Sequence, residues 1–198
     1  GGTIYEHAAR ALDHSLRTGT HGLPLMGTGD WNDGMNRVGQ EGRGQSVWLG
    51  WLLVRTLALF NPLAEARDPA RAARWRAHAQ AVTTALECEA WDGAWYRRAT
   101  FDDGTWLGTR DNEECRIDSI AQSWAVLSGA ADPGRAQAAM ESLRAHLLVP
   151  DPGLALLGHH DHPTRPRRGR AGHLDPATRR TRVGLGDRAS RPGLPVQR

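Results

Sequence analysis

The run VWLGWLLVRTLALF at residues 47–60 constrains the fold of this 198-residue chain more than any other stretch. Its apolar residues cover nearly every side of the helix that they predict, so that helix must be buried among other elements. Ser46 stands directly before the run, where a serine hydroxyl caps the first backbone N–H groups of a helix. The run is shorter than the roughly 18 apolar residues that indicate a membrane span. We therefore expect a core helix of a globular domain, with no membrane span and no signal peptide.

Four further segments predict helices, because their apolar residues recur at spacings of three and four. Between the helices, two long segments at 18–46 and 91–117 have no such period. Asp-Gly pairs at 92–93 and 103–104 predict turns and a short hairpin in the second of these loops. The helical segments, with the residues expected to face inward, are 4–16 (Ile4, Ala8, Leu12, Leu16), 70–90 (Trp75, Ala79, Val82, Leu86), a segment capped by Asp118 that runs through Val126 and Leu127, and 135–148 (Met140, Leu143, Leu147). This order favours an all-α fold of helical hairpins in a ring or stack, with a site built from loops at one end.

Residues 158–198 differ from the rest in composition. They are rich in arginine, glycine, proline and histidine, and they contain no aromatic residue. Such a segment buries too little apolar surface to offset its chain entropy, so we expect a disordered tail. All 25 basic residues of the chain are arginines, and ten of them lie after residue 150 against four aspartates. The positive charge thus belongs to the tail, and we expect no nucleic-acid partner for the folded part.

Neither the histidines nor the cysteines follow the spacing of a metal site. Three histidines at 159–162 have one aspartate among them and no cysteine nearby. Cys88 and Cys115 are predicted to be reduced thiols, which fits a cytoplasmic location.

The sequence GDWNDG at residues 29–34 places two carboxylates, an indole and an amide between glycines. One interpretation is a turn in which the Asn and Asp side chains bond their own backbone. A calcium loop is disfavoured, because its required glycine would fall on Met35. The third interpretation is a sugar site, in which the indole covers the apolar face of a pyranose and the polar groups bond its hydroxyls. A carboxylate kept protonated by a dry surround would then serve as general acid to a glycosidic oxygen.

The second long loop repeats this mixture of aromatic and charged residues. Its aromatic residues either contact a carbohydrate or cover the helical core; they are Trp91, Trp95, Tyr96, Phe101 and Trp106. Its arginines either hold an anion such as phosphate or pair with nearby acids. The arginines are Arg97, Arg98 and Arg116, and the acids are Asp102, Asp103, Glu113 and Glu114. Gln122 lies in the apolar helix that follows, where it needs a hydrogen-bond partner or lines a pocket.

Three motifs carry a resemblance to a known family. They are GTGDWNDGMNRVG (27–39), WDGAWYRRATFDDGTWLGT (91–109) and EECRIDSIAQSWAVLSGAA (113–131). They resemble the inverting glycoside phosphorylases of the cellobiose-phosphorylase group, glycoside hydrolase family 94. They are most similar to the C-terminal phosphorylase-like domain of cyclic β-1,2-glucan synthases. The resemblance implies that residues 1–157 are part of an (α/α)6 barrel catalytic domain.

The resemblance also implies roles within GDWNDG. Asp33 would be the general acid. Only the resemblance distinguishes it from Asp30, because neither composition nor spacing does. Trp31 would line the pocket of the sugar on the non-reducing side of the cleaved bond, and Asn32 would shape the same pocket. Asp30 would orient a sugar hydroxyl or brace the loop.

The implied reaction is phosphorolysis of β-linked glucosides, or its reverse, with inversion, foremost on β-1,2-glucans. The partners would be a β-glucan oligosaccharide with phosphate or glucose 1-phosphate, and inorganic phosphate would be a co-substrate with no cofactor or metal. Phosphate is already an anionic nucleophile, whereas an inverting hydrolase needs a second carboxylate about 6.5–9.5 Å away. Arg116 and Gln122 are lesser candidates for substrate binding. The alternatives are an inverting hydrolase that uses a base outside this fragment, and a non-catalytic, carbohydrate-binding or vestigial fragment.

The chain departs from the family pattern at both ends. The Arg and Asp with which the family grips the same sugar would precede residue 1, and the Glu-Asn-Gly-Gly…His motif that serves phosphate does not follow Leu157. An arginine-rich chain without lysine is typical of GC-rich coding DNA, so we hypothesise a shift of the reading frame near residues 157–158. We expect the isolated chain to be inactive, and a parent protein of the glucan-synthase type to be associated with the inner membrane.

Overall fold

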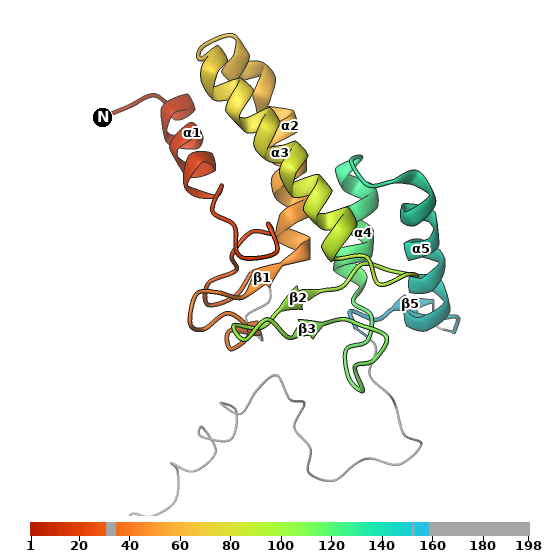
Figure 1. Cartoon of the computed structure of the whole chain (residues 1–198). Coiled ribbons are helices and arrows are strands. Elements are labelled where there is room, and N and C mark those ends of the chain that lie inside the picture. Colours follow the sequence, from red (N-terminus) through yellow and green to blue (C-terminus); the bar gives the residue numbers. More distant parts are fainter. Residues whose placement is uncertain (31–34, 152, 159–198) are drawn as a thin grey trace, which may run out of the picture.

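The computed structural model describes residues 1–30, 35–151 and 153–158 of the chain. These residues contain five helices and two small antiparallel sheets (Figure 1). The helices are α1 (Ile4–His14), α2 (Val47–Glu65), α3 (Pro69–Glu89), α4 (Ser119–Ser128) and α5 (Pro133–Leu147). The strands are β1 (Gln45–Ser46), β2 (Ala99–Thr100), β3 (Trp106–Leu107), β4 (Leu148–Val149) and β5 (Leu154–Ala155). Every predicted helix is present and the largely helical fold is confirmed, whereas a closed barrel is not seen in the described part of the chain.

Helix α2 is the centre of the fold, as its uniformly apolar sequence predicts. It packs along α3, to which residues 66–68 join it, and against α4 (Figure 1). Ser46 caps it as predicted, because its Oγ accepts a hydrogen bond from the Leu49 backbone N–H at 3.2 Å. Buried side chains of α2, α3, α4 and the second long loop form the main core, in which Trp51 meets the Tyr96 ring edge-on at a centroid distance of 5.1 Å.

By length and composition alone, α2 is also able to cross a membrane, which differs from the sequence-based expectation of no span. The helix is longer than the predicted apolar run, since it continues through Pro62 to Glu65. A buried core helix passes the same test, and 50% of this stretch is buried inside the fold. The property is therefore weak evidence for a membrane.

Helix α1 packs on α2 and α3 through a second apolar cluster. Near its end, Asp13 accepts a hydrogen bond from Trp75 Nε1 at 2.8 Å and pairs with Arg71 at 3.2 Å. These bonds attach the end of α1 to α3, and Leu12 and Leu16 pack against the cluster as predicted. Ile4, expected inward, is 90% exposed, while Ala9 is fully buried.

Helix α5 packs through Leu143 and Leu147 as predicted, but Met140, also expected inward, is 37% exposed. Strands β4 and β5 form a hairpin after it. The Ser119 backbone N–H then donates to the Leu157 carbonyl at 2.7 Å, so the chain returns to the start of α4. The rest of the predicted tail lies outside the described residues.

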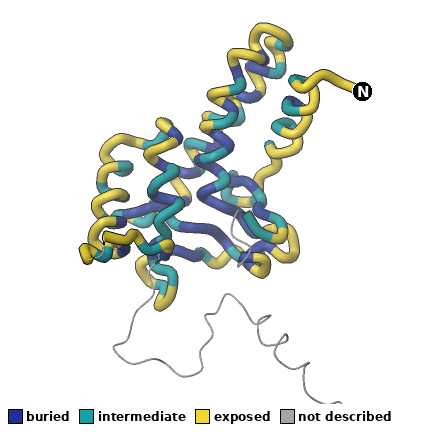
Figure 2. Tube along the Cα trace, turned by 180° about the vertical axis from the view of Figure 1, so that it is seen from behind, coloured by how far each residue is buried: buried dark blue, intermediate teal, exposed yellow. Residues whose placement is uncertain are grey.

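The three-stranded sheet joins the two long loops. Strand β1 ends the first loop and pairs with β2 of the second, with Ser46 opposite Ala99. Strands β2 and β3 form the hairpin that the turn signals predict. Figure 2 shows buried residues concentrated where these loops meet α2 and α4, and exposed residues along the far ends of α2 and α3. The sheet therefore brings both loops to one end of the helices.

Candidate functional site

The predicted acid loop is described in part. Trp31, Asn32 and Asp33 lie outside the described residues, whereas Asp30, Arg116 and Gln122 lie within them. Asp30 is thus the residue through which this loop connects to the described site.

Asp30 lies in a buried network with Arg98 and Ser46. The Arg98 Nη2 atom lies 2.7 Å from Asp30 Oδ2 and donates to Oδ1 at 2.9 Å. Ser46 Oγ donates to Asp30 Oδ2 at 2.8 Å and accepts from Arg98 Nη1 at 3.2 Å. The Arg98 side chain is 2% exposed and the Asp30 side chain 0%. Charges buried this deeply need paired and hydrogen-bonded partners, which the two groups supply to each other.

Asp118 adds a second carboxylate to the same cation. Its Oδ2 lies 3.4 Å from Arg98 Nε, and its Oδ1 accepts from the Ile120 backbone N–H at 2.9 Å, so it caps α4 as predicted. Burial raises the pKa of the Asp118 carboxyl above its ordinary value, against the opposing effect of Arg98 and of the backbone N–H groups at the cap. The Arg98 guanidinium therefore forms ion pairs with two carboxylates, those of Asp30 and Asp118.

Two helix N-termini complete the electrostatics of the network. Ser46 caps α2 and Asp118 caps α4, and these helices pack against each other. The N-terminal end of a helix carries a partial positive charge of about half an elementary charge. The two helix ends therefore compensate for the negative charge that Arg98 alone leaves unbalanced.

Asp102, in the turn between β2 and β3, holds the end of the first loop. Its carboxylate accepts from the backbone N–H groups of Glu41 at 2.7 Å, Arg43 at 2.8 Å and Gly44 at 2.9 Å. Burial opposes the ionisation of Asp102, but these N–H groups together with the Arg43 guanidinium lower its pKa below the ordinary value. The sequence predicts Asp102 as a partner of the arginines in its own loop; its partners lie instead on the first loop.

Gln122 finds its hydrogen-bond partners inside the core. The side chain is fully buried. Its Oε1 accepts from the Tyr96 backbone N–H at 2.8 Å, and its Nε2 donates to the Tyr96 carbonyl at 2.7 Å and to the Asp118 carbonyl at 3.0 Å. Arg116 also bonds backbone, since its Nε donates to the Arg110 carbonyl at 3.1 Å. These contacts hold the second loop together, and a role of either residue in substrate binding stays a prediction.

The aromatic residues of the second loop cover the core. Trp95 and Tyr96 are buried, and the other three pack against the apolar clusters while partly exposed. Arg97 lies over the Trp106 ring, with its guanidinium carbon 4.9 Å from the ring centroid, and pairs with Asp92 at 3.0 Å. The predicted pairing of arginines with acids thus occurs for Arg97 and Arg98, but with acids other than those predicted.

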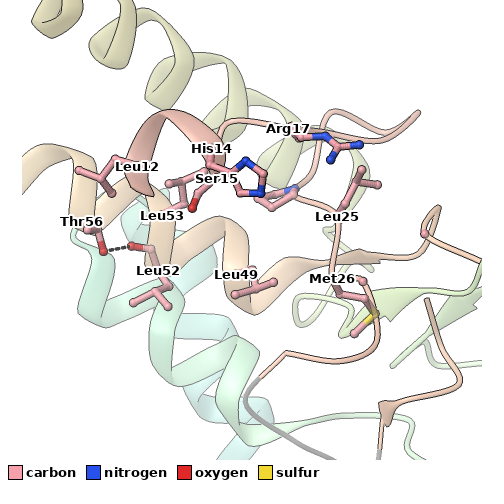
Figure 3. Close-up of a pocket in the computed structure, with 13 residues that line it drawn as sticks. Leu12, His14, Ser15, Arg17, Leu25, Met26, Leu49, Leu52, Leu53 and Thr56 are labelled. Carbon is pink, nitrogen blue, oxygen red and sulfur yellow. Dashed lines mark hydrogen bonds between the residues drawn. The ribbon is translucent and has the colours of Figure 1, made fainter. Parts of the chain in front are cut away.

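A cavity of about 530 Å³ lies beside the first loop, between the end of α1 and α2 (Figure 3). Five leucines with Pro24 and Met26 make up just over half of its lining residues, and His14 and Arg17 lie at one side. The described residues that line it include no tryptophan, tyrosine or carboxylate, which a sugar site of the predicted kind requires. The described part of its lining is therefore mainly apolar, and the predicted sugar-site residues Trp31, Asn32 and Asp33 lie outside the described residues.

The sequence did not predict the network around Arg98. One signal was present, because successive side chains of a strand point to opposite faces. Arg97 and Arg98 directly precede β2, so one of them is expected to point inward and to need an acid. Asp30 was not identifiable as that acid without knowledge of how the two loops pair.

Comparisons with known proteins place the chain among carbohydrate-active enzymes. The model of the glycosyl hydrolase 94 superfamily, catalytic domain, matches residues 1–163. The chain is 56% identical over 152 residues to the cyclic β-(1,2)-glucan synthase NdvB of Rhizobium meliloti. It is 40% identical over 146 residues to the 3-O-β-D-glucopyranosyl-β-D-glucuronide phosphorylase of Paenibacillus borealis, and 34% identical over 152 residues to the N,N'-diacetylchitobiose phosphorylase of Vibrio furnissii. These alignments cover 76%, 71% and 75% of this chain, but only 5%, 19% and 18% of the three relatives.

Proposed function

This chain belongs to the glycosyl hydrolase 94 superfamily, and we propose that it carries the acid-bearing part of an enzyme that breaks or forms β-glucosidic bonds with phosphate. The observation that carries the proposal is the match of the catalytic-domain model to residues 1–163, which include GDWNDG and both long loops. The relatives named above are phosphorylases and a glucan synthase, which supports the same reaction class.

In this proposal Asp33 is the general acid. Its carboxyl donates a proton to the glycosidic oxygen while a phosphate oxygen attacks the anomeric carbon from the opposite face of the sugar ring. The bond between the anomeric carbon and the glycosidic oxygen breaks, and its electron pair stays on that oxygen, which becomes a hydroxyl. The sugar leaves as a 1-phosphate of inverted configuration. Trp31 and Asn32 shape the pocket for that sugar.

The surroundings of Asp30 argue against this carboxylate as the base of an inverting hydrolase. An inverting hydrolase needs a second carboxylate that contacts the attacking water. The Asp30 side chain is 0% exposed and bonded to Arg98 and Ser46, so it is poorly placed to accept a proton from water. Phosphate needs no such base, and Asp30 then acts as a brace for the loop.

We assign β-1,2-glucans as the substrate class. The support is the 56% identity to a protein named as a cyclic β-(1,2)-glucan synthase, compared with 40% and 34% for phosphorylases named for other substrates. The chain spans a small fraction of each relative, so the activity of a whole enzyme that contains it is part of this proposal.

A graft tests the role of Asp33. Residues 1–157 replace the aligned stretch of the Paenibacillus phosphorylase, and release of sugar 1-phosphate is measured with its disaccharide and phosphate. Asp33→Asn in the graft is expected to lower kcat about 10²–10⁴-fold, because proton donation to the leaving group is lost. A glucoside with a nitrophenolate leaving group, which needs no proton, should be affected far less. Asp103→Asn, at an exposed carboxylate of the β2–β3 turn, is the control, and equal rates for the two variants would refute the assignment.

Titration calorimetry on the 198-residue chain tests the substrate class. A β-1,2-linked gluco-oligosaccharide is expected to bind more tightly than a β-1,4-linked one of equal length. In the graft, saccharide binding without turnover in any buffer would favour the non-catalytic alternative, and cleavage in phosphate-free buffer would favour a hydrolase.

A further inference from the structure

The buried network around Arg98 joins three parts of the chain that are distant in sequence. Asp30 belongs to the acid loop, Ser46 begins α2 and Asp118 begins α4. Arg98 lies 2.7, 3.2 and 3.4 Å from these three side chains. Its own backbone is fixed by the hairpin, because its N–H donates to the Leu107 carbonyl at 2.8 Å. Arg98 is thus a rigid centre to which the three other elements are attached.

Ser46 couples the position of Asp30 to the start of α2. A hydroxyl offers one donor and two acceptor positions. Ser46 Oγ donates to Asp30 and accepts from Arg98 and from the Leu49 backbone N–H, so all three positions are used. The Asp30 carboxylate therefore cannot move without disturbing a bond of the atom that caps the helix.

Asp33 follows Asp30 by three residues, so the network holds the described residue from which the acid-bearing stretch continues. A displacement of about 1 Å at a reacting group is enough to lower a rate about 100-fold. We propose that Arg98 is a positioning residue for the reaction proposed above: by holding Asp30 against the N-terminal ends of α2 and α4, it sets the place of the general acid. This inference rests on the proposed function of Asp33.

The geometry requires arginine and not merely a positive charge. Nη1 and Nη2 of Arg98 donate to Ser46 and Asp30, while Nε lies 3.4 Å from Asp118 as an ion pair without a hydrogen bond. A lysine ammonium is a single point charge on a flexible stem and cannot reproduce this fork. Arg98→Lys therefore keeps the charge and removes the positioning.

The test uses the full 198-residue chain labelled with 5-fluorotryptophan. Fluorine resonances of Trp31 and Trp75 are assigned by their loss in Trp31→Phe and Trp75→Phe. Arg98→Lys is expected to move or broaden the Trp31 resonance beyond its wild-type linewidth and to leave the Trp75 resonance in place.

Arg71→Lys is the matched control. Arg71 also bridges two aspartates, Asp13 at 3.2 Å and Asp68 at 3.0 Å, and Asp13 accepts a hydrogen bond from Trp75 Nε1. This variant is expected to move the Trp75 resonance and leave that of Trp31. A general loosening of the fold would move both resonances in both variants, so the opposite responses separate positioning from stability.

A Trp31 resonance that is the same in wild type and Arg98→Lys, or that moves equally in both lysine variants, would overturn the inference. If Arg98→Lys does not fold, Asp30→Asn tests the same ion pair by changing its acidic member. This variant is expected to move the Trp31 resonance and to leave the Trp75 resonance in place. No sugar or phosphate is present in this experiment. Its outcome is therefore independent of whether Asp33 is the acid, which the graft decides separately.

Discussion

Arg98 binds Asp30 across 68 residues of sequence, with one guanidinium nitrogen 2.7 and 2.9 Å from the two carboxylate oxygens. Both side chains are almost wholly buried. Transferring two charges from water into the protein costs about as much free energy as their mutual attraction gains. Such a pair therefore adds little net stability. Losing one partner is costly, because the other charge then stays buried alone. The pair therefore fixes the geometry of the two loops more than it stabilises the fold.

Arg98→Met is expected to lower the free energy of unfolding by about 3–5 kcal/mol, since it leaves two buried carboxylates without their cation. Asp30→Asn should cost less, about 1–3 kcal/mol, because the amide still accepts a hydrogen bond. The double variant should lose less than the sum of the two single variants. Urea denaturation at neutral pH measures all three. Arg76→Met, which breaks the exposed pair with Glu65, is the control and should stay within about 1 kcal/mol of wild type.

Gln122→Leu tests whether the buried amide is structural. The substitution leaves the Tyr96 N–H and carbonyl without their side-chain partner, and each unpaired buried group costs about 1–3 kcal/mol. We expect the free energy of unfolding to fall by about 2–5 kcal/mol, measured by urea denaturation. Gln122→Glu should also destabilise, because a carboxylate cannot donate to the Tyr96 carbonyl. In the graft, a Gln122→Leu enzyme that folds is expected to keep its KM, and a raised KM would instead support substrate binding by Gln122.

The helices and their caps were predictable because their signals are local. Ser46 and Asp118 both cap where the sequence predicts, and the apolar run after Ser46 forms the buried central helix. The inward face of α1 was predictable in its second half, where Leu12 and Leu16 pack against the second apolar cluster. At the start of the helix Tyr5 and Ala9 pack there instead of Ile4, which only contacts with α2 and α3 decide.

The site was less predictable because its partners are set by loop pairing. The sequence predicted that Arg98 pairs with acids of its own loop, whereas the β1–β2 pairing brings Asp30 of the first loop to it. The same pairing gives Asp102 its backbone partners on the first loop. Neither long loop has a hydrophobic period from which this register follows. The motifs therefore identified the family and the candidate acid, but not the network that holds the loop.

Asp102 gives the protein an acid-sensitive contact between its two loops. An unfolded aspartate titrates near pH 3.9, and the folded Asp102 carboxyl has a lower pKa. Its contribution to stability is thus fully present above about pH 4 and is lost as the pH falls through the folded pKa. Asp102→Ala should lower the free energy of unfolding by about 1 kcal/mol at neutral pH, and this difference from wild type should shrink towards about pH 2. Asp102→Asn, which has one acceptor oxygen and no charge, should show a smaller difference from wild type at neutral pH that shrinks over the same pH range, because the titrating group is the wild-type carboxyl. A constant difference for Asp102→Ala would contradict the mechanism.

One face of α2 carries exposed apolar side chains. Leu52, Thr56, Leu59 and Leu63 follow at spacings of four, three and four, so they share a face of the helix. Leu59 is 63% exposed and Leu63 49%, while Leu52 lines the apolar cavity. Aligned leucines of this kind bind apolar dyes and promote self-association.

The double substitution Leu59→Gln and Leu63→Gln is expected to lower the fluorescence of bound anilinonaphthalene sulfonate and the apparent mass in light scattering. Glutamine is a good helix former, and neither leucine is buried, so the free energy of unfolding should change by no more than about 0.5 kcal/mol. Ile4→Gln is the control, because Ile4 is 90% exposed on α1 and lies outside this face. If Ile4→Gln lowers dye binding as much as the double variant, the dye does not report on the α2 face. If the double variant unfolds at a lower urea concentration, these leucines contribute to the core more than their exposure indicates.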